Sequence, residues 1–243
     1  VYNPKDSSVE DYLSTSGGEP PLRAKLLSSW RQRLVFLRPA DDPHQWHMGA
    51  AGDPLDNDLF PAVVTPSTAI GGTLSERAGL APDLINAFVP YTDDLAIFGC
   101  DHSIHILRGD PQADGQFDRV ADTVGMAFGD SWAKDPEGHV YFFGSEGGVH
   151  VMNPGGQIAR LSRDSIERQL QNVDLSVSNM RLAWNYREEG LHVFQTTRGS
   201  GGSLVAGWFW DKRNNAWFRD TFALASLQPS AVYSFDGDAP GDR

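Results

Sequence analysis

Short apolar segments recur along most of the chain, and turn-forming residues separate them. The clearest pair occupies residues 204–210 and 216–219, and the polar segment 211–215 between them suits a turn. Four earlier pairs follow the same pattern, at residues 33–37 and 45–49, 94–99 and 103–108, 139–144 and 148–152, and 180–186 and 191–196. In the third of these, Gly147 can supply the positive φ of a tight turn. The pattern predicts antiparallel β-hairpins.

The apolar segments also repeat at a regular distance. The tripeptides Ile-Phe-Gly and Phe-Phe-Gly begin at positions 97 and 142, 45 residues apart, and Val193 follows 51 residues after position 142. One blade of a β-propeller takes roughly 40 to 50 residues. We therefore expect an all-β fold of antiparallel, propeller-like repeats of hairpins, with about fourteen strands, or three to four blades of four strands.

Two short helices are expected as insertions, at residues 83–88 and 164–171. In the second, Asp164 can cap the helix and Glu167 can complete a capping box, while Ile166 and Leu170 share one face. Both helices are too short to form a layer of their own. Parallel βαβ folds are therefore disfavoured.

The ends of the chain differ in character from its middle. Residues 1–29 are expected to form an extended N-terminal arm, with regular structure starting at Trp30 and one propeller-like domain over residues 30–243. Residues 231–235 read as a strand that has no following partner, and Val1 is not an initiator residue. We therefore expect a domain that is incomplete at the C-terminus, within a longer polypeptide, and poor solubility when residues 1–243 are expressed alone.

The charge balance bears on possible partners. The chain has 20 Lys and Arg against 32 Asp and Glu, a net charge of −12, so sequence-specific DNA binding is disfavoured. The single Cys100 excludes an internal disulfide, and no apolar run approaches the roughly 20 residues that cross a bilayer. These features favour a protein without a membrane anchor that is assembled in a reducing cytoplasm.

Catalytic motifs are weak in this sequence. Gly129, Asp130 and Ser131 resemble the nucleophile segment of serine esterases, with Asp41 and His44 as a possible acid and base pair. The order of the two blocks is reversed relative to that class, so we expect that Asp130, Ser131 and His44 do not meet. The paired carboxylates of a glycosidase cannot be identified from sequence, and the sialidase Asp-box and nucleotide-binding glycine loops are absent. We expect no enzymatic activity.

Two sets of residues have side chains of the types that bind metal ions. Cys100, His102 and His105, with His44 and His47, carry the atoms that zinc prefers, but their spacing on strands does not bring them together. The acidic segment 53–58 lacks the glycine and the distal Glu of an EF-hand loop. We therefore expect no catalytic, cofactor-binding or metal-binding residues and no cofactor, and we expect most of the seven Trp to pack in the core.

Two blocks of the sequence resemble a known protein family. Residues 33–36, Arg-Leu-Val-Phe, followed by Trp46 and Gly-Asp-Pro-Leu-Asp at 52–56, form the first, although Ala50 and Ala51 stand where the family has Ser and Asn57 where it has Phe. The second comprises residues 95–110, with Ser103 and Ile104 at its centre, and residues 138–150 fit as well. These segments are similar to the propeller-type tail proteins of bacteriophages, and among them to the nozzle, or tail tubular protein B, of short-tailed phages.

The resemblance spans residues 20–243 and implies a structural virion protein of the phage tail. Such a protein forms a ring of copies, as a hexamer, below the portal and adaptor proteins, contacts tail-fibre proteins, and surrounds a channel through which DNA passes. An acidic channel wall would keep the DNA mobile, which agrees with the net charge. Two alternatives remain: a propeller-type protein-interaction module of cellular origin, and a propeller enzyme acting on glycans.

Overall fold

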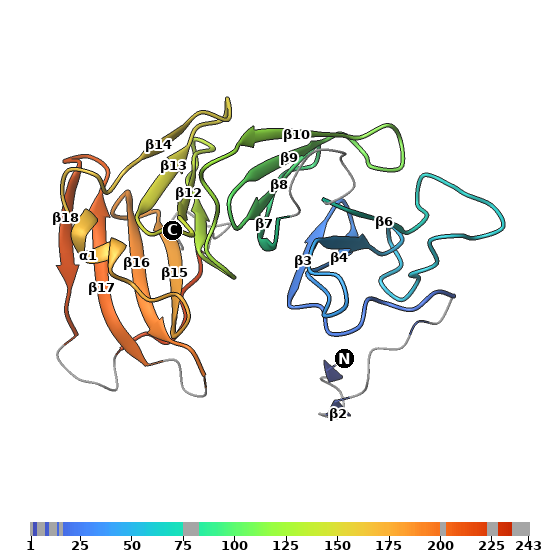
Figure 1. Cartoon of the computed structure of the whole chain (residues 1–243), viewed down its shortest axis with the longest axis horizontal. Coiled ribbons are helices and arrows are strands. Elements are labelled where there is room, and N and C mark those ends of the chain that lie inside the picture. The colour runs from blue at the N-terminus through green and yellow to red at the C-terminus, as the bar shows by residue number, and fades with distance from the viewer. Residues whose placement is uncertain are drawn as a thin grey trace. The chain divides into compact units, whose positions relative to one another are not determined.

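The computed structural model of the chain describes residues 2–3, 8–9, 14, 17–74, 83–199, 203–222 and 228–234. Over these residues the chain forms four four-stranded antiparallel sheets with very little helix (Figure 1). In each sheet the strands pair in the order in which they follow one another in the chain. The expected all-β antiparallel fold is confirmed.

The strand boundaries define the four sheets. The first contains β3 (Leu26–Trp30), β4 (Arg33–Leu37), β5 (Gln45–Met48) and β6 (Ile70–Thr73). The second contains β7 (Ile85–Thr92), β8 (Leu95–Cys100), β9 (Ile104–Arg108) and β10 (Gln116–Ala121). The third contains β11 (Trp132–Lys134), β12 (Val140–Phe143), β13 (Val149–Met152) and β14 (Ile158–Arg160). The fourth contains β15 (Ser178–Asn185), β16 (Gly190–Thr197), β17 (Leu204–Asp211) and β18 (Ala216–Asp220).

The described residues also contain a two-stranded pair and one short helix. A separate pair, β1 (Tyr2–Asn3) and β2 (Ser8–Val9), precedes the first sheet, and the helix α1 (Glu167–Gln171) lies between the third and fourth sheets in the chain. The chain divides into two compact units, residues 1–98 with 105–118 and residues 99–104 with 119–243. The second sheet contributes residues to both units.

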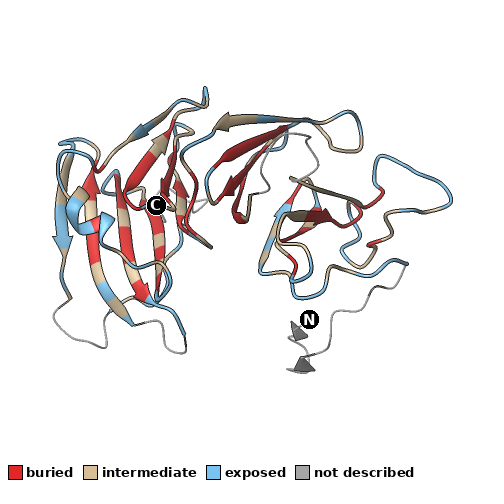
Figure 2. Cartoon of the chain, viewed as in Figure 1, coloured by how far each residue is buried: buried red, intermediate tan, exposed pale blue. Residues whose placement is uncertain are grey.

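All five predicted hairpins are present. They are β4–β5, β8–β9, β12–β13, β15–β16 and β17–β18. The repeated Phe-Gly dipeptides lie at the ends of β8 and β12, and Val193 lies on β16, so the repeat in the sequence marks the second strand of successive sheets. Of these second strands, β8 and β12 are almost wholly buried on both faces, while β16 is buried along most of its length, as the colours of Figure 2 show.

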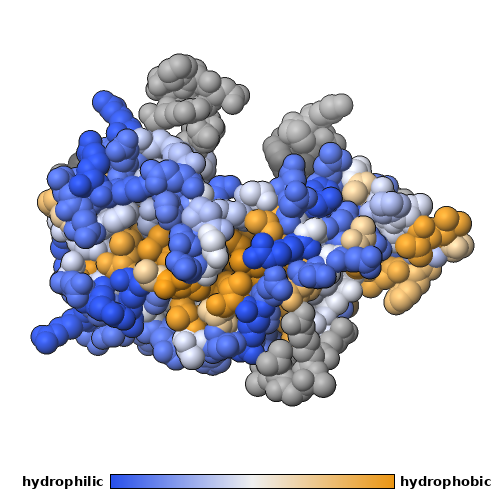
Figure 3. Space-filling view, turned by 90° about the horizontal axis from the view of Figure 1, so that it is seen from above, coloured by the Kyte–Doolittle hydropathy of each residue, from blue (hydrophilic) through white to orange (hydrophobic). Residues whose placement is uncertain are grey.

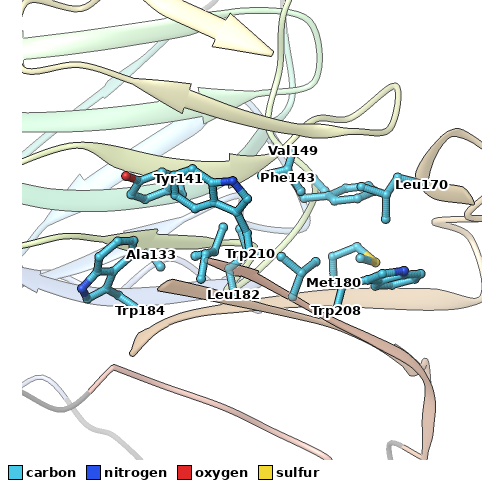
Figure 4. Close-up of a cluster of buried hydrophobic side chains, with 13 residues drawn as sticks. Ala133, Tyr141, Phe143, Val149, Leu170, Met180, Leu182, Trp184, Trp208 and Trp210 are labelled. Atoms are coloured by element: carbon cyan, nitrogen blue, oxygen red, sulfur yellow. The ribbon is translucent and has the colours of Figure 1, made fainter. Parts of the chain in front are cut away.

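Aromatic side chains join neighbouring sheets within each unit. In the first unit, Trp46 of β5 lies 6.2 Å from Phe98 of β8 and 5.6 Å from Phe117 of β10, between ring centroids. In the second unit, Tyr141 of β12 stacks on Trp184 of β15 at 5.3 Å with an interplanar angle of 15°. Figure 4 shows side chains of the third sheet facing those of the fourth across this core. Five of the seven Trp are buried, as expected: Trp30, Trp46, Trp184, Trp208 and Trp210.

Four details of the prediction are wrong. Residues 83–88 do not form a helix, because residues 85–89 are all buried in β7, and a strand buried on both faces has no alternating pattern. The first sheet begins at Leu26 and not at Trp30, since β3 is an edge strand with two serines in it. The second helix does form and ends at Gln171, but it begins at Glu167, and no side chain caps it. Residues 231–234 have no regular structure, and Phe235 lies outside the described residues.

The glycine at the end of β8 has a steric role that a substitution can test. A Cβ atom at Gly99 would lie 2.5 Å from Cγ and 2.7 Å from Cβ of Met126, which is fully buried. We expect Gly99→Ala to lower the free energy of unfolding by about 1–3 kcal/mol, because the packed core must shift. Gly155→Ala, at an exposed position with only the Asn153 side chain nearby, should change it by less than about 0.5 kcal/mol. Urea denaturation of both variants makes the comparison, and equal effects would contradict the steric role.

Candidate functional site

The loop between β11 and β12 gathers three ionisable side chains on a tight turn. The backbone N–H of Gly138 donates to the carbonyl of Asp135 at 3.1 Å, and Gly138 has a φ of 85°, which favours glycine. The backbone N–H of His139 donates to Oδ1 of Asp135 at 2.8 Å. This turn brings the side chains of Asp135, Glu137 and His139 close to one another.

Asp135 is the centre of the site. Its side chain is fully buried, and its Oδ2 atom lies 3.0 Å from Nζ of Lys212 and 3.1 Å from the hydroxyl of Tyr141. Nδ1 of His139 lies 3.0 Å from the same oxygen. A carboxylate offers about four acceptor positions, and with the backbone N–H of His139 the chain supplies four donors. The hydrogen-bonding capacity of Asp135 is therefore met by its own protein.

Lys212 comes from the turn between β17 and β18, so the network joins the third and fourth sheets. Its backbone N–H donates to the carbonyl of Glu189 at 3.1 Å. Its ammonium group also lies 2.8 Å from the more exposed Glu137 and 5.5 Å from the centre of the Trp184 ring. The cation is therefore held by two carboxylates and the face of one indole.

The surroundings of Asp135 and Lys212 favour the ionised form of each side chain. Burial by itself would raise the pKa of Asp135, but hydrogen bonds from His139 and Lys212 outweigh it and hold the pKa below its ordinary value of 3.8. Burial would lower the pKa of Lys212, but hydrogen bonds to Glu137 and Asp135 raise it above 10.5. Burial, with the charge of Asp135, also raises the pKa of Tyr141.

The directions of the two pKa shifts define the pH range over which the ion pair of Asp135 and Lys212 contributes stability. The lowered pKa of Asp135 contributes stability that is present above pH 3.8 and lost as the pH falls through its folded-state pKa. The raised pKa of Lys212 contributes stability that is present below pH 10.5 and lost as the pH rises through its folded-state pKa. The ion pair therefore stabilises the second unit throughout the physiological range.

The same residues resemble a metal site but are already occupied by a cation. Asp135, Glu137 and His139 are the one group in the described part of the chain whose ligand atoms lie close enough together for an ion. The ammonium group of Lys212, however, contacts both carboxylates. We interpret the cluster as a structural ion-pair network between two sheets.

A second cluster of polar side chains lies around the β12–β13 turn. The hydroxyl of Ser162 donates to Glu167 at 2.6 Å, and the same Glu167 pairs with Arg160, whose Nη2 donates to the carbonyl of Gly147 at 3.1 Å. These contacts explain why Glu167 does not form the predicted capping box. His150 and Arg160 both border a small hollow of about 60 Å³ beside this turn. Burial, with the nearby charge of Arg160, lowers the pKa of His150 to about 4.

An open pocket of about 420 Å³ lies along β11 and β15, next to residues 232–234. Its lining includes Trp132, Lys134 and Tyr186, and the exposed Tyr233 borders it. The backbone N–H of Trp184 donates to the hydroxyl of Ser234 at 2.7 Å. The segment that was predicted as an unpaired strand is thus attached to the edge of the fourth sheet by a side chain.

The residues of the esterase hypothesis have separate partners. The buried hydroxyl of Ser131 donates to the carbonyl of Ala127 at 2.6 Å. Asp130 pairs with Arg181, and Nδ1 of His44 lies 2.8 Å from the carbonyl of Asp83. These are ordinary hydrogen bonds and ion pairs of residues that lie beside a strand or a turn.

The structure also shows where the metal-ligand candidates from the sequence lie. Cys100 and His105 are buried on β8 and β9, and His102 lies in the exposed turn between them. His47 lies 3.1 Å from the side-chain oxygen of Asn57. In the acidic segment, Asp53, Asp56 and Asp58 each accept from the backbone N–H two residues further on, at 2.9–3.0 Å, which makes it a series of Asx-turns. Where the structure describes the chain, these residues form no metal-binding group.

The ion-pair network was not predicted from the sequence. Asp135 and Lys212 are 77 positions apart, and each looks like an ordinary turn residue in its own segment. The one local signal is Asp-Pro-Glu-Gly at 135–138, which marks a tight turn between two apolar segments.

Comparison of the sequence with protein-family models and with curated proteins gives no match. Among the described residues, no helix has the length and apolar character needed to cross a bilayer.

Proposed function

We propose that this chain is a structural protein of a bacteriophage tail, of the nozzle type, and that its four sheets are blades of a propeller. The observation that carries the proposal is the repetition of one unit: four successive four-stranded meanders, each built in chain order. Repeated sheets of this kind are typical of propellers, in which the blades surround a central channel.

The neighbours of the first strand in each sheet support a radial arrangement. In the first unit β3 lies beside β7, and in the second unit β11 lies beside β15. Each of these is the first strand and an edge strand of its own sheet. In a propeller the first strands of neighbouring blades come together around the axis, while the sheets pack face to face. The aromatic contacts of Trp46 and of Tyr141 supply that packing within each unit.

The ion-pair network supports a structural role for the junction between the third and fourth sheets. The acceptor positions of Asp135 are filled by donors of its own chain, and the ammonium group of Lys212 is shared by two carboxylates. Such a network favours a single arrangement of the two sheets. This is what a protein needs if it must keep its shape under the passage of a genome.

The partners follow from the proposed role. Copies of the chain would form a ring, as a hexamer, between adaptor and portal proteins on one side and tail-fibre proteins on the other, in the virion. The net charge of −12 suits a channel wall, since a basic wall would bind phosphates and retain the DNA.

The proposed assembly predicts a large particle in solution. A hexamer has six times the mass of its subunit, which is at least about 160 kDa for a subunit that contains the 26.6 kDa of residues 1–243, and electron micrographs should show rings with a central opening. Sedimentation velocity over a range of protein concentrations measures this mass. Fluorescent double-stranded DNA added to the same samples should show no sequence-specific binding. A chain that stays monomeric at every concentration, alone and with adaptor protein, would favour the cellular interaction module instead.

A further inference from the structure

The loop between β5 and β6 exposes a continuous apolar tip. Residues 60–64, Phe-Pro-Ala-Val-Val, form this tip, and the residues Phe60, Val63 and Val64 are 90%, 74% and 67% exposed. Figure 3 shows apolar surface on the part of the first unit where Figure 1 draws this long loop. Contiguous exposed apolar residues of this kind mark interaction sites.

The loop that carries the tip is held in place by hydrogen bonds. The fully buried Arg33 donates from Nη1 to the carbonyls of Gly49 and Thr68, at 3.0 and 2.7 Å, and from Nη2 to the carbonyl of Pro66 at 2.6 Å. On the other side of the tip, the backbone N–H of Phe60 donates to Asp58 at 2.9 Å. The tip is therefore presented in a defined position, which lowers the entropic cost of docking.

The same unit contains a cavity that can accept an aromatic ring. It has a volume of about 260 Å³, and its lining includes Trp46, Ile70, Leu74, His105, Pro111 and Phe117. An enclosed apolar cavity of about 150 Å³ binds benzene, and this larger pocket, which is open to solvent, has room for one ring. Two glycines of β6 also border it, and a Cβ atom at Gly72 would lie 2.8 Å from the Trp46 ring, so glycine is required beside that ring.

We propose that the apolar tip of one copy docks into the aromatic cavity of a second copy, with the ring of Phe60 inside the cavity. Phe60 is exposed in its own chain, so it does not fill its own cavity. A protrusion and a complementary cavity on one molecule make a head-to-tail contact, which closes into a ring if the rotation permits. The inference rests on the proposed assembly of copies and names the surfaces that make it.

Cysteine cross-linking tests the contact directly. Val63→Cys chains, which keep the Phe60 anchor, and Thr73→Cys chains are mixed and oxidised with diamide; Thr73 lines the cavity, and the native Cys100 is buried and common to both. We expect a disulfide-linked dimer in the mixture and none in either variant alone. Val63→Cys mixed with Val205→Cys, an exposed apolar position in the other unit, should give no dimer. A linkage within single chains of a Val63→Cys, Thr73→Cys double variant, with no dimer in the mixture, would overturn the proposal.

The strength of self-association gives an independent measurement. Phe60→Asp should weaken it at least about thirtyfold, as loss of a central aromatic anchor does, while Val205→Asp leaves it unchanged. Both positions are exposed, so the melting temperature of the dissociated chain should stay the same. If the native chain assembles but Phe60→Asp assembles equally well, the tip is not the contact and the proposed ring stands. If the native chain is monomeric and the mixture gives no dimer, both proposals fail.

Discussion

Replacing Asp135 by alanine is expected to lower the free energy of unfolding by about 3–5 kcal/mol. Asp135 is fully buried and accepts from Tyr141, His139 and Lys212. Its removal leaves the buried Tyr141 hydroxyl without its acceptor and leaves Lys212 with only the exposed carboxylate of Glu137, so the desolvation of these groups is no longer fully compensated. Urea denaturation followed by tryptophan fluorescence reports the change, since Trp184 lies beside Lys212.

Glu137→Ala is the matched control for this prediction. Glu137 also contacts Lys212, at 2.8 Å, but its side chain is 64% exposed, and exposed ion pairs contribute about 1 kcal/mol or less. The two variants remove carboxylates from the same lysine and differ mainly in burial. Equal losses of stability in the two variants would show that the buried network is not what holds the third and fourth sheets together.

The second large effect is a loss of stability between pH 7 and pH 4 caused by His150. The folded state lowers the pKa of His150 from 6.5 to about 4, so the unfolded chain binds a proton more readily over this range. The contribution of the neutral ring is therefore complete above pH 6.5 and is lost as the pH falls toward 4. A shift of this size corresponds to about 3 kcal/mol, since one pKa unit is about 1.4 kcal/mol.

The variant His150→Leu should abolish this part of the pH dependence. The effect of the Asp135 carboxyl is centred below pH 3.8, because its pKa is lowered, and it is common to the native chain and the variant. His102→Leu, at an exposed turn position, is the control and should keep the native slope. The free energy of unfolding is measured in urea at several pH values from 7 to 4. A slope that is the same in His150→Leu as in the native chain would contradict the assignment to this ring.

The errors of the sequence analysis have specific physical causes. The segment 85–89 has no alternation because both of its faces are buried, so a helix could not be distinguished from a strand by periodicity. Glu167 lies at the expected position near the start of a helix, but Arg160 and Ser162 compete for its carboxylate. Both errors arise where contacts from other segments override a local pattern.

What the sequence determined by itself is the local β structure. Paired apolar segments around turn residues were enough to predict five hairpins, and the Phe-Gly repeat marked the second strands of successive sheets. These features depend on residues close together in the chain: a strand needs apolar side chains, and its turn needs residues that tolerate the turn's backbone angles.

Only the tertiary structure decided which distant residues meet. The contact between Asp135 and Lys212 joins residues 77 positions apart, and nothing in either segment signals the other. The cavity beside Trp46 likewise takes its walls from β5, β6 and residues 105–117. Such sites depend on how one sheet packs on the next, and that packing is set by the fit of side chains such as Tyr141 and Trp184 between sheets.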